Sequence, residues 1–252
     1  MRPTRRTFLK LTGAAAASLY TTRGFGQEGE EAATRSVIWY IDIEHQKSAS
    51  QGDFAIKRGA IEEAAPGCSV NYVWYGDVVS NPSSLESMKA GNVLAWFISG
   101  NTAEWADYIK STPSISQFEE VLVNNTTIPM FAVCGGHQIM SVAFGGAIAH
   151  MSGCPTDKDC EYDKTLPITV LAPSDPIFAG LPTAPEFVFW HHDEVISSPE
   201  FSLLAKTASC KYQVLKHKER LIYTTQFHPE LRGPHGVELM TNFFNLCKRH
   251  SY

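Results

Sequence analysis

The sequence lacks three features that would each point to a particular class of protein. Its 252 residues have a formal net charge of −5, so there is no excess of basic residues of the kind that binds nucleic acid. No run reaches the roughly 18 consecutive apolar residues that indicate a membrane-spanning helix. No Cys-x-x-Cys pair occurs among the six cysteines, so they form no zinc-binding pattern. We therefore predict no nucleic-acid partner, no membrane span and no metal site.

The beginning of the chain differs in composition from the rest. Residues 1–6 contain three arginines and no acidic residue, and an alanine-rich, mildly apolar stretch follows at 11–20. An arginine pair before such a stretch resembles a twin-arginine export signal. We predict a signal peptide at 1–27, a flexible leader at 28–35 and export to the periplasm. The alternative is a basic N-terminus of a cytosolic protein.

The cysteines leave the question of disulfides open. In an exported protein, Cys154 and Cys160 could form a bridge, because they flank a short polar loop. The sequence does not pair the others, and Cys68, Cys210 and Cys247 can equally be small buried apolar residues.

Between residues 36 and 133, short apolar runs alternate with helical patterns. This alternation indicates βαβ units and a parallel sheet with helices on both faces. After Gly153 the pattern changes to short strand-like pieces, which predict an antiparallel extension, and a final helix is expected at about 236–248. The predicted strands are 36–41, 70–74, 93–98 and 129–133, followed by 166–171, 186–189, 202–206 and 221–226. We see no linker or repeat after residue 35, so 36–252 is predicted to be one α/β domain.

A nucleophilic cysteine is predicted where the fourth strand ends. Cys134 follows the apolar run 129–133, two glycines come next, and an apolar helix then begins. In such a turn the glycines let the backbone reverse direction, and the nucleophile is raised above the sheet edge. The adjacent helix N-terminus favours the thiolate. The alternative is a structural cysteine on a glycine-rich turn.

A second motif supplies a base for the thiol. His228, Pro229 and Glu230 end the strand-like run 221–226. Because proline fixes the backbone after His228, the imidazole and the Glu230 carboxylate can project from the same side of the turn. Glu230 would then orient one nitrogen of the imidazole while the other faces the nucleophile.

Together the two motifs resemble those of class I glutamine amidotransferases. The segments are Cys134-Gly135-Gly136-His137-Gln138 and Gln226-Phe227-His228-Pro229-Glu230. The resemblance implies a flavodoxin-like αβα layered domain with a mostly parallel central sheet and a small antiparallel extension. It also implies Cys134 as nucleophile, His228 as base and acid, and Glu230 as the orienting carboxylate. Gly100 and Gly135 would donate oxyanion N–H groups, Gln138 would anchor a small-molecule, glutamine-like amide, and no cofactor is expected.

Several residues depart from the family pattern. Ala132 replaces a glycine before the nucleophile, and Asn101-Thr102 replaces Gly-Pro in the predicted oxyanion loop. Trp190 and His192 replace small residues that line the glutamine pocket, so the substrate is left open. Since His191 and His192 are adjacent on a predicted strand, they point to opposite faces, and we expect one packed and one solvated side chain.

These observations lead to three hypotheses for function. The first is an exported, stand-alone cysteine hydrolase that attacks a carboxamide or γ-glutamyl-type amide through a thioester. The second is a glutaminase subunit that delivers ammonia to a separate synthase partner. The third is a catalytically silent binding module with the same fold.

Overall fold

A computed structural model describes residues 35–47, 51–108, 114–154, 156 and 160–250. The predicted signal peptide at 1–27 and the leader at 28–35, apart from Arg35, lie outside these residues, so both remain predictions. None of the helices described is long and apolar enough to cross a membrane.

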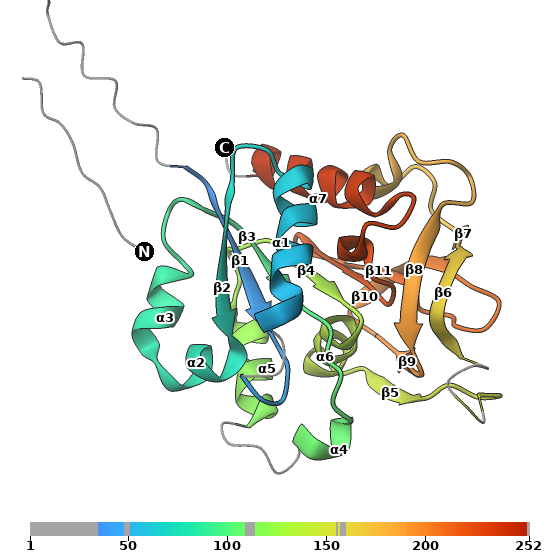
Figure 1. The fold of residues 1–252 in the computed structure, drawn as a ribbon, viewed down its shortest axis with the longest axis horizontal. Helices are drawn as coiled ribbons and strands as arrows, with labels where there is room; N and C mark the ends of the chain where they lie inside the picture. Colours follow the sequence, from blue (N-terminus) through green and yellow to red (C-terminus); the bar gives the residue numbers. More distant parts are fainter. Residues whose placement is uncertain (1–34, 48–50, 109–113, 155, 157–159, 251–252) are drawn as a thin grey trace, which may run out of the picture. The chain divides into compact units, whose positions relative to one another are not determined.

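The centre of the described chain is an eight-stranded sheet in the order β2-β1-β3-β4-β12-β11-β10-β7 (Figure 1). Neighbours from β2 to β12 pair in parallel, and the pairs from β12 to β7 are antiparallel. The strands are β1 (Val37–Asp42), β2 (Ser69–Trp74), β3 (Val93–Ile98), β4 (Met130–Val133), β7 (Thr169–Val170), β10 (Phe201–Lys206), β11 (Val214–His217) and β12 (Ile222–Thr225).

Helices cover both faces of this sheet (Figure 1). Alternate residues of β3 point to opposite faces, so that Phe97 packs in one core and Trp96 in the other. This double burial explains why the parallel strands are nearly continuous apolar runs. The Phe97 core includes α1 (Gln51–Ala64) and α7 (Gly236–His250); the Trp96 core includes α2 (Tyr75–Ser80), α3 (Pro82–Ser87), α4 (Trp105–Tyr108), α5 (Ile115–Asn124) and α6 (Gly135–Ala143).

Two small antiparallel sheets complete the described structure. Figure 1 shows them on the side of the central sheet away from β2. One pairs β5 (Ala147–His150) with β9 (Asp193–Ser197), and the other pairs β6 (Glu161–Pro167) with β8 (Glu186–His191). The junction of β8 and β9 carries residues 190–193 to the predicted site.

The layered α/β fold predicted from the sequence is confirmed, with one correction. The sequence pattern predicts that the run 221–226 belongs to the antiparallel extension, whereas β12 pairs in parallel with β4 on one side and antiparallel with β11 on the other. The chain reverses after β11, and β12 then enters the sheet between β11 and β4. Local sequence does not specify such a partner, because the pairing joins residues about ninety positions apart.

All six cysteines lie among the described residues, and no disulfide joins any of them. The bridge considered between Cys154 and Cys160 is therefore not present. These two residues are instead buried with Cys210 and Met151 in a small cluster.

Candidate active site

Cys134 occupies the turn between β4 and α6. Its backbone has φ 50° and ψ −113°, a conformation that costs a non-glycine residue about 1–3 kcal/mol. Two hydrogen bonds hold it: the Cys134 N–H donates to the Thr225 carbonyl (2.8 Å), and the Cys134 carbonyl accepts from the Gln138 N–H (3.0 Å). The residue is 6% exposed. The predicted strand–turn–helix geometry is therefore present, and it is strained at the predicted nucleophile.

The two glycines after Cys134 are needed for close packing. A Cβ on Gly136 would lie 2.6 Å from the Ser99 carbonyl oxygen, so a side chain there would push α6 away from the end of β3. A Cβ on Gly135 would lie 1.7 Å from Oδ1 of Asn101. The side chain of Asn101 therefore occupies the space that the glycine leaves open.

His228 and Glu230 meet beside this turn. Nδ1 of His228 lies 2.8 Å from Oε1 of Glu230, and the two residues are 8% and 1% exposed. Burial lowers the pKa of His228, but the negative charges of Glu230 and Cys134 outweigh it and raise that pKa to about 10. Burial raises the pKa of Glu230, but the charge of His228 outweighs it and holds that pKa below its usual value. The geometry thus favours an imidazolium next to the thiol.

Gly100 connects the two motifs in space. A Cβ at this position would lie 3.0 Å from Cε1 of His228 and 3.1 Å from Cβ of Cys134. A side chain larger than hydrogen would crowd both. Four of the residues selected from the sequence, Cys134, His228, Glu230 and Gly100, therefore lie together at the carboxyl ends of β3, β4 and β12, and Gly135 adjoins them.

Comparison with known proteins identifies the family. The family model "Glutamine amidotransferase class-I" matches residues 61–247. The chain is 32% identical to a subunit of the glutamine-hydrolysing GMP synthase of Pyrococcus abyssi, over 68% of this chain and 84% of that protein. The protein is a class I glutamine amidotransferase family member. The subunit of the same name from Methanococcus maripaludis is 36% identical, over 68% of this chain and 82% of that one.

A solved structure supports the fold of this amidotransferase. A protein described as a GMP synthase subunit from Thermoplasma acidophilum superposes with a TM-score of 0.66 and 22% identity, covering 85% of this chain and 95% of that one. The flavodoxin-like layered fold implied by the resemblance is thereby confirmed.

Gln138 makes its hydrogen bonds within the amidotransferase itself. Its amide nitrogen donates to the Asp193 carbonyl (2.9 Å) and to Oε1 of Gln226 (3.2 Å), and its amide oxygen accepts from the Trp105 indole N–H (2.7 Å). Both N–H groups of the Gln138 amide are thus used, whereas its oxygen can accept a second hydrogen bond. Two of the partners, Trp105 on the short helix α4 and Asp193, line the cavity at Cys134.

Glu44 is a site residue that sequence reasoning missed. It follows β1, is 6% exposed, and accepts hydrogen bonds from the backbone N–H (2.8 Å) and the hydroxyl (3.1 Å) of Thr102. These bonds fix the loop that contains Gly100. An acidic residue two positions after the end of a buried strand was the only available signal, because parallel strands bring their carboxyl ends to one edge of the sheet.

The two adjacent histidines contact different acidic residues. Nε2 of His191 is buried 2.8 Å from Oε2 of Glu161, whereas Nε2 of His192, which lies at the bend between β8 and β9, is 3.7 Å from Oε1 of Glu104. The strand alternation predicted for this pair therefore does not apply, because His192 is not on a strand, and both side chains line the cavity at Cys134. Hydrogen bonds from His191, Ser209 and Thr207 hold the pKa of Glu161 below its usual value, although burial alone would raise it. This buried pair fixes the end of β8. On the same strand, the backbone carbonyl of Trp190 accepts a weak hydrogen bond from the thiol of Cys134, with 3.7 Å between Sγ and the oxygen.

Two cavities adjoin the site. The cavity at Cys134 has a volume of about 40 Å³ and is also lined by Gln138, Trp105 and Trp190. The cavity at His228 has a volume of about 200 Å³ and is also lined by Lys57. The two cavities share four lining residues: Asn101, Thr102, Trp190 and His192. The cavity at Cys134 is therefore narrow, and a substrate whose amide reaches the thiol would extend into the larger cavity beside His228.

Gly135→Ala is expected to destabilise the protein by about 1–3 kcal/mol, because the added methyl group overlaps the side chain of Asn101. Asn101→Ala in the same chain removes that overlap, so the double variant should recover most of the loss. Urea unfolding of both single variants and the double variant measures the coupling. Strictly additive effects would contradict this account.

Proposed function

We propose that this amidotransferase hydrolyses the side-chain carboxamide of glutamine through a thioester on Cys134, as the glutamine-hydrolysing subunit that supplies ammonia to a separate synthase. The main observation in favour of this chemistry is the position of the His228 imidazole. Its Nδ1 lies 2.8 Å from Oε1 of Glu230, and the ring lies beside Cys134 and Gly100. A thiolate and an imidazolium in this arrangement provide both a nucleophile and a proton donor.

In the proposed reaction, Sγ of Cys134 attacks the carboxamide carbon. The tetrahedral oxyanion is stabilised by backbone N–H groups of Gly100 and Gly135. The C–N bond then breaks, and His228 gives its proton to the departing nitrogen, which leaves as ammonia. His228, now neutral, takes a proton from a water molecule that attacks the thioester, and glutamate and the free thiolate are released. Glu230 stays ionised and keeps the imidazole oriented.

Two observations favour a synthase partner. The relatives quoted above are named as one subunit of a glutamine-hydrolysing GMP synthase. In addition, the cavity at Cys134 is narrow, at about 40 Å³. A pocket that widens when a partner binds would couple hydrolysis to the use of ammonia.

The test measures glutamate release by the purified chain alone and with the synthase subunit from the same organism. We expect slow hydrolysis alone and an increase of at least about tenfold with the partner. In parallel, 6-diazo-5-oxo-norleucine should form an adduct that peptide mapping places on Cys134. Both reagents are applied with and without the synthase subunit. If iodoacetamide labels Cys134 but the glutamine analogue does not, the substrate is a different amide; if neither reagent reacts under either condition, the protein is a silent binding module.

A second candidate is the exported, stand-alone hydrolase of a γ-glutamyl-type amide. It is motivated by the arginine pair at the N-terminus and by Trp190 and His192, which replace small residues at the pocket. Fractionation of cells that express the full chain tests export. Hydrolysis at full rate without any partner, by a protein recovered from the periplasm, would support this candidate over the first.

A further inference from the structure

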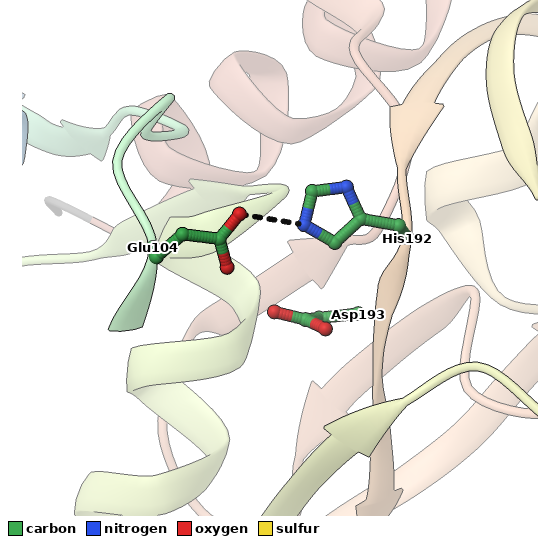
Figure 2. Close-up of side chains that lie close together, drawn as sticks. All are labelled: Glu104, His192 and Asp193. Atoms are coloured by element: carbon green, nitrogen blue, oxygen red, sulfur yellow. Dashed lines mark ion pairs between the residues drawn. The ribbon is translucent and has the colours of Figure 1, made fainter. Parts of the chain in front are cut away.

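A group of metal-binding side chain types lies at the mouth of the Cys134 cavity and has no part in the proposed reaction. Glu104, His192 and Asp193 each offer one ligand atom, and all three atoms lie within 4.8 Å of one another. Figure 2 shows the three side chains pointing toward a common space. Glu104 comes from the loop after β3, whereas His192 and Asp193 come from the junction of β8 and β9.

The separation of these atoms suits one shared ion. Nε2 of His192 lies 3.7 Å from Oε1 of Glu104. Two ligands of a tetrahedral zinc ion, each about 2.0–2.2 Å from the metal, are about 3.4 Å apart. A shift of a few tenths of an ångström would therefore be enough to bring both atoms into one coordination sphere.

The neighbouring His150 supports the same arrangement. Its Nδ1 lies 3.2 Å from Oδ1 of Asp193, and its ring is 5.6 Å from that of His192. In metal sites, ligating carboxylates are usually held by a further hydrogen bond of this kind. The carboxylates of Glu104 and Asp193 lie close together and repel each other, and a cation between them removes that repulsion.

We propose that Glu104, His192 and Asp193 bind a divalent transition-metal ion at the mouth of the Cys134 cavity. One imidazole and two carboxylates suit zinc, manganese, iron or cobalt, whereas calcium and magnesium prefer sites built from oxygen ligands alone. Three protein ligands leave coordination positions for water. Glu104 is 68% exposed, so the ion can be exchanged with solvent.

Bound metal would join the two walls of the cavity. Glu104 belongs to the same loop as Gly100, and Asp193 is tied through its carbonyl to Gln138 on α6. Because His192 and Asp193 line the cavity that Cys134 also lines, an ion there restrains the segments that border the path to the thiol. The bound ion therefore slows access to the thiol.

Metal titration of the full chain, purified without a histidine tag, tests the site. We expect Co²⁺ to give the visible absorption of a low-symmetry site without the intense near-ultraviolet band of a thiolate complex, and Zn²⁺ to displace it. Glu104→Gln and Asp193→Asn should each weaken the affinity for Zn²⁺ by at least about tenfold. The matched control is Glu86→Gln, at an exposed position on α3. Unchanged affinity in both site variants would overturn the proposal.

Labelling of Cys134 tests the effect on access. Zn²⁺ should slow iodoacetamide labelling of the wild type at concentrations that leave Glu104→Gln unaffected. Equal slowing in both proteins would mean that zinc acts on the thiol itself, and it would overturn the proposed closure. Because the metal titration needs no turnover, its result is independent of whether the protein hydrolyses glutamine.

Discussion

Cys134→Ala is expected to lower glutamine hydrolysis by about four orders of magnitude or more, because it removes the atom that forms the thioester. Alanine fits the site without new contacts, since it only removes the sulfur. The strained backbone at φ 50° is retained, and the fold should be stable. The measurement is the rate of glutamate release, with the synthase partner present if hydrolysis requires it.

Cys68→Ala is the matched control. Cys68 is also buried, at 3% exposure, but it packs in the core that contains α1 and α7. Its loss should leave turnover within about twofold of the wild type and cost only some stability. If Cys134→Ala kept its activity, or if both variants lost theirs equally, the assignment of the nucleophile would be wrong.

The second large effect is expected for Glu230→Gln, which keeps the shape of the side chain and removes its charge. The charge of Glu230 is the largest of the causes that raise the pKa of His228 to about 10. Without it, only the interaction with Cys134 opposes the lowering of this pKa by burial, so the imidazolium beside Cys134 is less stable. Because a positive neighbour favours the reactive thiolate, labelling by iodoacetamide should be slower in Glu230→Gln by about tenfold or more.

The pH profile separates this role from simple destabilisation. The rate of labelling in Glu230→Gln should rise more steeply with pH than the rate in the wild type, because the raised pKa of His228, about 10, keeps the imidazolium beside Cys134 in the wild type. Glu120→Gln, at an exposed position on α5, is the control and should match the wild type. A labelling rate in Glu230→Gln that does not change with pH, whatever its absolute value, would contradict the proposed charge pair.

The same pair predicts how stability depends on pH. The pKa of His228 is raised from 6.5 to about 10, so its contribution is fully present below pH 6.5 and is lost as the pH rises toward 10. The pKa of Glu230 is lowered, so its contribution is present above pH 4.5 and is lost as the pH falls. The urea midpoint of the wild type should therefore fall both at high pH and at low pH. The midpoint of His228→Asn should change less with pH.

The sequence alone determined the parts of this protein that depend on neighbouring residues. The turn at Cys134 was predictable because an apolar strand, two glycines and an apolar helix lie within a few residues of one another. His228 and Glu230 were predictable as a pair because Pro229 restricts the backbone between them. The order of strands and helices followed from hydrophobic patterns whose period is set by local geometry.

Only the tertiary structure decided which distant segments meet. It placed β12 beside β4, and with it His228 beside Cys134. It brought Glu44 from the end of β1 to the loop of Gly100, and it set Glu104 against His192 and Asp193 at the cavity mouth. These contacts join residues about sixty to ninety positions apart, and they depend on how whole strands pair and pack. No local pattern encodes such pairing, because many partners satisfy the same preference for a buried strand.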